Sequence, residues 1–156
     1  MKNKLVEILL KVLLGGAELA FVGGLGYMRI LNTGWLLILF GLGLVLWVVF
    51  HLGVMAVFIA SFRLKILDTA LYLALHFFYL WAWLLQSDGG DSDKATWTIQ
   101  SLYYIPGLDP LLTKWGDTLF WAAFIATLVC YLAVGIVLLV RLVKFLKTRP
   151  KNVLAV

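Results

Sequence analysis

A chain of 156 residues is long enough for one domain, but 63% of its residues are hydrophobic and only 13% are charged. Because ordinary soluble domains carry about 25% charged residues, this composition excludes a soluble fold and indicates a single membrane domain over residues 1–156. The net charge of +5 does not indicate nucleic acid binding, since the basic residues gather at the ends of apolar runs, where they face lipid headgroups.

Four segments are apolar over roughly the 20 residues that a membrane-spanning helix needs. In chain order they cover residues 12–31, 35–61, 66–86 and 119–140. Short connections join the first three, and a longer, aromatic-rich connection at 87–117 precedes the fourth. The pattern predicts an all-α, polytopic integral membrane protein with four transmembrane helices in an antiparallel bundle.

The first predicted helix carries a carboxylate on one face and small residues on another. Glu18 would cost about 2.5–3.5 kcal/mol in hydrocarbon unless it is paired, protonated or hydrated, so we expect it to face protein. It could be a hydrogen-bonded structural carboxyl or a proton or cation site. Gly16, Ala20 and Gly24 follow at four-residue spacing and predict close packing against a second backbone, inside the bundle or on a partner chain.

The second and third predicted helices each place one histidine near mid-membrane. His51 lies eleven residues before Phe62, and His76 lies eleven residues after Lys65. With a rise of about 1.5 Å per residue, the two imidazoles are predicted at the same depth on antiparallel neighbours. They could ligate a haem b from two sides, bind a small metal, pass protons with Glu18, or be hydrogen-bonded structural histidines. Haem would need spread helices, because adjacent helices normally pack about 8–10 Å apart.

The third predicted helix carries polar-tipped side chains at steps of three or four residues, which places them on one face. Tyr72 and Tyr79 flank His76 on this face. We expect the face to look toward protein, and the two tyrosines are candidate members of a proton relay.

The lysines and arginines predict the orientation, because they are enriched on the cytoplasmic side of short connections. Three basic residues fall on the side of the 31–35 and 87–117 connections, and ten fall on the other. We therefore expect both termini in the cytoplasm and residues 87–117 outside, in the plasma membrane, or in the inner membrane if the protein is bacterial. The three are Arg29, Lys94 and Lys114, and the ten are Lys2, Lys4, Lys11, Arg63, Lys65, Arg141, Lys144, Lys147, Arg149 and Lys151.

The sequence carries no P-loop, dinucleotide fingerprint, zinc-protease motif or nucleophile elbow. We therefore assign no catalytic residue and no metal ligand, and we do not expect an enzyme. The leading expectation is a non-enzymatic membrane subunit that packs against partner chains, or against copies of itself, through the glycine face and the outer connection. The alternatives are electron transfer by a haem b held by His51 and His76, and proton or cation translocation with Glu18 as the carrier.

Overall fold

The computed structural model describes residues 2–31, 35–63, 65–88, 96–102 and 105–148, and nearly all of them are helical, as predicted. The four long helices pack with α3 against α5 and α1 against α2. A short helix and one antiparallel pair of two-residue strands lie between α3 and α5. The elements are α1 (Lys2–Leu31), α2 (Trp35–Ala60), α3 (Ile66–Leu84), β1 (Ser87–Asp88), β2 (Thr96–Trp97), α4 (Thr98–Leu102) and α5 (Leu108–Thr148).

Three of the described helices are long and apolar enough to cross a membrane: residues 41–60 of α2, α3, and α5. Their outward faces carry large aliphatic side chains, among them Val49, Leu73 and Leu132, each about 60–70% exposed. Apolar surface of this extent is unfavourable in water and favourable in hydrocarbon. These helices place the protein in a membrane.

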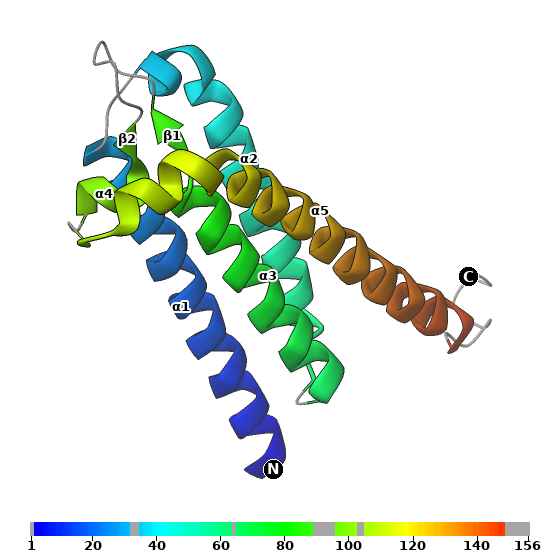
Figure 1. The fold of residues 1–156 in the computed structure, drawn as a ribbon. Helices are drawn as coiled ribbons and strands as arrows, with labels where there is room; N and C mark the ends of the chain where they lie inside the picture. Colours follow the sequence, from blue (N-terminus) through cyan, green and yellow to red (C-terminus); the bar gives the residue numbers. More distant parts are fainter. Residues whose placement is uncertain (1, 32–34, 64, 89–95, 103–104, 149–156) are drawn as a thin grey trace.

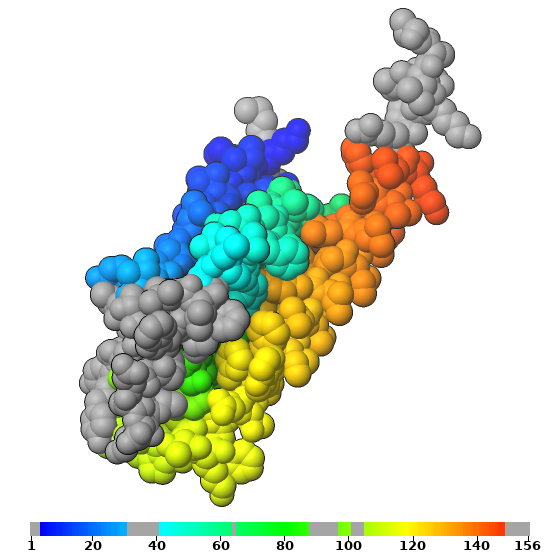
Figure 2. All heavy atoms as spheres, turned by 90° about the horizontal axis from the view of Figure 1, so that it is seen from above, coloured from blue at the N-terminus to red at the C-terminus, as the bar shows by residue number. Residues whose placement is uncertain are grey.

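The two ends of the molecule differ in what they contain. Figure 1 shows the start of α1, the turn between α2 and α3, and the end of α5 at one end, with the strands and α4 at the other. Figure 1 also shows α1 and the second half of α5 diverging toward that first end, and Figure 2 shows α2 between them on the face in view. We call the end with the strands and α4 the α4 end, and the opposite end the α2–α3 turn end. Lys94, Arg149 and Lys151, which contribute to the predicted orientation, lie outside the described residues.

The helices are longer than the apolar segments that predicted them. α1 begins at Lys2 rather than at residue 12, and α5 begins at Leu108 within the predicted 87–117 connection. Residues 108–117, which were predicted to belong to the connection, therefore form the first part of the last helix. Pro110 is compatible with helix there because it lies in the first turn, where its missing N–H has no helical acceptor. With 41 residues, α5 is about 60 Å long, roughly twice the hydrocarbon thickness.

Asp68 ties the α2–α3 turn to α5 at the α2–α3 turn end. The carboxylate is 1% exposed, forms an ion pair with Arg141, and accepts a hydrogen bond from the Arg63 backbone N–H at 2.8 Å. Arg141 also donates to the Ser61 backbone carbonyl at 2.9 Å. Because the charge of Asp68 is paired and hydrogen-bonded, its burial is tolerated.

Candidate functional site

Glu18 lies on the inner face of α1, as predicted. It is 3% exposed, and the buried residues Val22, Leu25 and Arg29 continue the same stripe along the helix at steps of three or four. The opposite side of α1 is apolar and exposed, for example at Leu19. The helix therefore presents the Glu18 carboxylate to the protein interior.

The structure brings Glu18 together with both histidines, which come from two other helices. Glu18 Oε2 lies 2.6 Å from His76 Nε2 on α3, and Glu18 Oε1 lies 2.7 Å from His51 Nε2 on α2. The two imidazole rings lie at one level, with their centroids 5.8 Å apart. We call Glu18, His51 and His76 the Glu18 cluster. Its polar atoms bridge three helices of the bundle.

The far nitrogen of each imidazole also has a partner. His76 Nδ1 lies 2.7 Å from the Tyr72 backbone carbonyl, and His51 Nδ1 lies 2.6 Å from the Tyr131 hydroxyl on α5. A carbonyl oxygen can only accept, so His76 Nδ1 carries a proton and donates it. A hydroxyl can donate or accept, so the tautomer of His51 depends on the direction of the Tyr131 hydrogen bond.

Aromatic rings surround the two imidazoles. The Tyr79 ring stacks on His51 with centroids 4.0 Å apart, and the Tyr72 ring lies 4.1 Å from His76. Phe21 contributes a further ring at 5.0 Å from His76. These rings pack against both imidazoles and cover part of their surface. His51 is fully buried, whereas the His76 side chain keeps 13% of its surface exposed.

The two contacts of Glu18 differ in quality. The contact with His76 has hydrogen-bond geometry. The contact with His51 is equally short, but Glu18 Oε1 lies out of line with the ring nitrogen, and neither atom has an aligned hydrogen-bond partner among the described residues. A buried polar pair of this kind is costly to leave unsatisfied. A small rotation of either side chain would align it.

The distances decide between a metal centre and a proton-bridged cluster. One ligand atom from each of the three side chains lies within 4.8 Å of the others, so together they could hold a metal ion. Ligand atoms about 2.0–2.1 Å from one tetrahedral zinc ion are separated by about 3.3 Å from each other. The nitrogen–oxygen separations of 2.6 and 2.7 Å are shorter and fall in the hydrogen-bond range. The observed geometry is that of a proton-bridged cluster.

The arrangement gives no support to a haem between the histidines. Both Nε2 atoms point at Glu18, so the carboxylate fills the position that an iron ion would need. Tyr79 also covers a face of the His51 ring. A porphyrin between these rings would require α1 to leave the bundle.

Tyr72 and Tyr79, the tyrosines predicted as members of a proton relay, contact the histidines through a backbone carbonyl and through their aromatic rings. Tyr72 contributes its backbone carbonyl, and the buried Tyr79 hydroxyl has no aligned partner among the described residues. Tyr131 is the tyrosine whose hydroxyl contacts the cluster. It was not among the residues predicted from the sequence. In the sequence, Tyr131 follows Thr127 by four residues, which predicts that both side chains lie on one face of a helix. In the structure this is the buried face of α5.

The predicted glycine face does not pack closely against the described residues of this chain. A Cβ atom added at Gly16 or Gly24 would meet nothing within 4 Å, and Ala20 is exposed. The alternative of packing inside the bundle is therefore not supported. Assembly with partner chains through this face, as a non-enzymatic subunit, stays a prediction.

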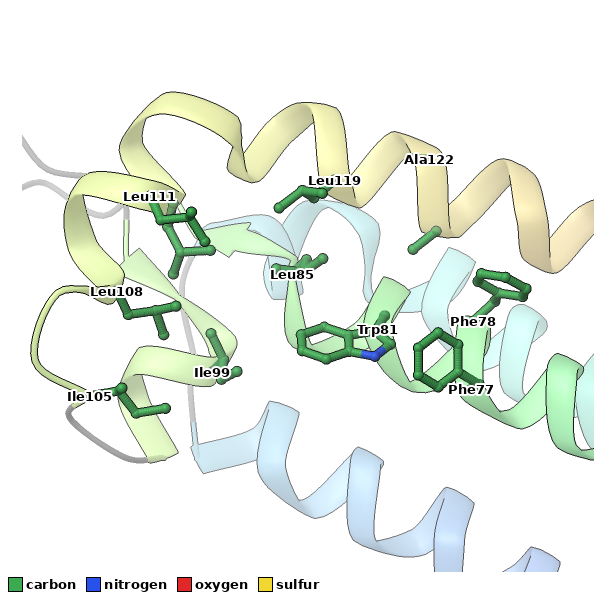
Figure 3. A pocket seen from close by; sticks show the side chains of 12 residues that line it. Phe77, Phe78, Trp81, Leu85, Ile99, Ile105, Leu108, Leu111, Leu119 and Ala122 are labelled. Atoms are coloured by element: carbon green, nitrogen blue, oxygen red, sulfur yellow. The ribbon is translucent and has the colours of Figure 1, made fainter.

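An apolar pocket lies apart from the Glu18 cluster, near the α4 end. It has a volume of about 470 Å³ and is enclosed by α3, α4 and the first turns of α5. Figure 3 shows Trp81 and Phe78 on one side and Ile99 and Leu111 on the other. Apart from the Trp81 indole, its lining side chains carry no polar atom. Its chemistry suits hydrocarbon and offers no reacting group.

Comparisons with models of protein families, with curated proteins and with solved structures found no match to this chain. The function of the Glu18 cluster is therefore inferred from its geometry and chemistry.

Proposed function

We propose that this protein moves protons within a membrane and that the Glu18 cluster is the site that accepts and releases them. The observation that carries the proposal is one buried carboxylate in contact with two imidazoles, at 2.6 and 2.7 Å. Intramembrane carboxylates and histidines are costly and mark proton pathways in pumps and transporters. Imidazole is suited to the role because its unperturbed pKa lies near neutral pH.

The hydrogen bonds of His76 indicate that one proton is shared between its imidazole and the Glu18 carboxylate. Since His76 Nδ1 carries its own proton toward Tyr72, a single further proton lies between His76 Nε2 and Glu18 Oε2. It can sit on the carboxyl, giving a neutral pair, or on the imidazole, giving an ion pair. The net charge is zero in both states, so the transfer changes no net charge in a medium of low dielectric constant.

The proposal includes a fourth membrane crossing, by α1. α1 has 30 residues, which is longer than the roughly 20 needed to span, and its outward side chains Leu9, Leu13 and Leu19 are about 60–65% exposed. With α1 inserted beside α2, Glu18 lies inside the bilayer region rather than at its surface. We propose that the termini and the α2–α3 turn face the cytoplasm and that α4 faces outward, in the plasma membrane or a bacterial inner membrane.

Substitution of Glu18 tests the proposal. Purified protein is reconstituted into liposomes that contain a pH-sensitive dye, and a proton gradient is imposed. Glu18→Gln keeps the shape and hydrogen-bonding capacity of the side chain but cannot ionise, so we expect proton flux to fall about tenfold or more. A helical circular dichroism spectrum matching the unsubstituted protein shows that the variant is folded.

Glu7→Gln is the matched control, because Glu7 is an exposed carboxylate on the same helix. The hydrogen bond from Lys11, at 2.7 Å, lowers the pKa of Glu7, so its carboxylate is charged at neutral pH. This variant should conduct as well as the unsubstituted protein. Unchanged flux in Glu18→Gln would make the carboxylate structural and end the proposal. Stoichiometric zinc that is lost in Glu18→Gln would instead identify a metal centre.

A further inference from the structure

A cleft between α2 and α5 leads from the α4 end toward the Glu18 cluster. Its outer part has a volume of about 450 Å³, and Arg29 and Asp117 contribute to its lining. Its inner part, of about 420 Å³, reaches Tyr131. Leu44 and Gln86 line both parts, so the two parts are neighbours. We call it the α2–α5 cleft.

Tyr131 separates the cleft from the cluster. Its side chain lines the inner part of the cleft, and its hydroxyl lies 2.6 Å from His51 Nδ1. The Phe50 ring holds it by an edge contact, with centroids 5.0 Å apart. The hydroxyl can donate its proton to His51 Nδ1 or accept one from it, and the relay below uses the orientation in which Tyr131 donates.

The lining of the α2–α5 cleft changes along its length. The outer part has charged and polar side chains, whereas the inner part is lined mostly by apolar ones such as Phe50 and Leu128, with Tyr131 at its inner limit. Each part of the cleft exceeds the roughly 30 Å³ that one water molecule occupies. The charged side chains of Arg29 and Asp117 lie along the outer part.

We infer that Tyr131 is the outward member of the proton relay, connecting water in the α2–α5 cleft to the Glu18 cluster. This inference rests on the proposed proton function. In the inward step, a hydronium ion in the cleft gives a proton to the Tyr131 oxygen, while the Tyr131 hydroxyl proton passes to His51 Nδ1. His51 Nε2 gives its proton to Glu18 Oε1. One proton enters and one reaches Glu18, Tyr131 stays neutral, and His51 exchanges its tautomer.

Removal of one hydroxyl tests the role of Tyr131. Tyr131→Phe keeps the ring that packs against Phe50 and His51 but interrupts the relay, so liposome proton flux should fall about tenfold or more. Tyr27→Phe is the control, because Tyr27 is 63% exposed on the outer side of α1. It should conduct as the unsubstituted protein does. Native flux in a folded Tyr131→Phe variant would overturn the inference.

Cysteine accessibility tests the water in the cleft independently of flux. In a Cys130→Ala background, Leu128→Cys places a thiol in the cleft, whereas Leu132→Cys places one on the outward face of α5, where the leucine is 69% exposed. A charged, membrane-impermeant thiol reagent added from the α4 side should label Leu128→Cys and block its proton flux, and it should not label Leu132→Cys. Equal protection of both thiols would mean a dry cleft and would contradict the inference.

The two sets of results separate this inference from the proposed function. If Glu18→Gln conducts normally, the proton function fails and the relay fails with it. If Glu18→Gln is blocked while Tyr131→Phe conducts and Leu128→Cys stays unlabelled, the proton function stands and protons reach the cluster by another route.

Discussion

Each histidine of the Glu18 cluster is oriented by the partner of its far nitrogen. The Tyr72 carbonyl fixes a proton on His76 Nδ1. If Tyr131 donates its hydroxyl proton to His51 Nδ1, as the proposed relay requires, the ring proton of His51 lies on Nε2. The two imidazoles then carry their protons on different nitrogen atoms, so that His51 can donate to Glu18 while His76 shares a proton with it.

The opposite tautomers can be measured directly. Nuclear magnetic resonance of protein labelled with ¹⁵N at histidine should show a protonated Nδ1 for one histidine and an unprotonated Nδ1 for the other. Tyr131→Phe removes the hydroxyl donor to His51 and should change only the His51 signals. A spectrum in which both Nδ1 atoms are protonated would show that Tyr131 accepts from His51 rather than donates.

The members of the cluster could be predicted from the sequence to different degrees. Glu18, His51 and His76 stand out because ionisable residues are rare in apolar helices, and equal distances from the α2–α3 turn gave the common depth of the histidines. Tyr131 could not be found this way, since it is 80 residues from His51 and tyrosines are common at membrane interfaces. Which tyrosine reaches an imidazole depends on helix rotation, which hydropathy does not determine.

At the level of elements, Trp97 of β2 packs against the first half of α5. The ring is 5% exposed and packs directly over Gly116, where an added Cβ would lie 2.4 Å from a ring carbon. Gln86 and Thr98 join the neighbouring segments through a backbone hydrogen bond of 3.0 Å. The lack of a side chain at Gly116 therefore allows the hairpin to dock on α5.

Replacement of that glycine should destabilise the outer part of the structure. Gly116→Ala forces the Trp97 ring to move, and overpacking of this kind costs about 1–3 kcal/mol. Gly135→Ala is the control on the same helix, because a Cβ there meets nothing within 4 Å, and alanine favours helix by about 0.8–1.0 kcal/mol. Thermal unfolding in detergent should lower the midpoint for the first variant and leave or raise it for the second. Equal midpoints would contradict close packing at Gly116.

The apolar runs predicted the presence of the long helices but not all of their bounds. Hydropathy identifies the residues that can lie in hydrocarbon, whereas a helix continues as long as its backbone hydrogen bonds are satisfied. The start of α5 at Leu108 follows from local geometry, with Gly107 at a positive φ of 84° immediately before it. Glycine tolerates this conformation, but the sequence alone gave no reason to choose it as the boundary.

At the scale of the whole molecule, basic residues lie at the α2–α3 turn end. Arg63, Lys65 and Arg141 flank the α2–α3 turn and the last part of α5, at the end where Figure 1 also shows the start of α1. Because basic residues favour the cytoplasmic side of a membrane, this grouping supports the proposal that this end faces the cytoplasm. With α1 as a fourth crossing, both termini would lie on that side.

Thiol labelling on intact cells tests the orientation. In a Cys130→Ala background, Ile105→Cys at the α4 end should react with a membrane-impermeant reagent, because Ile105 is 43% exposed on the proposed outer side. Lys65→Cys, in the exposed α2–α3 turn, should react only after the cells are permeabilised. The reverse pattern would invert the orientation while leaving the fold intact.

The separation of Glu18 from its partners along the chain has a consequence for biogenesis. α1 precedes α2 and α3 in the chain, and His76 follows Glu18 by 58 residues. During synthesis, Glu18 therefore leaves the ribosome before His51 and His76 do. If α1 spans the membrane as proposed, it enters with a protonated carboxyl or stays beside the insertion machinery until α2 and α3 arrive, so its stable integration depends on helices that are made later.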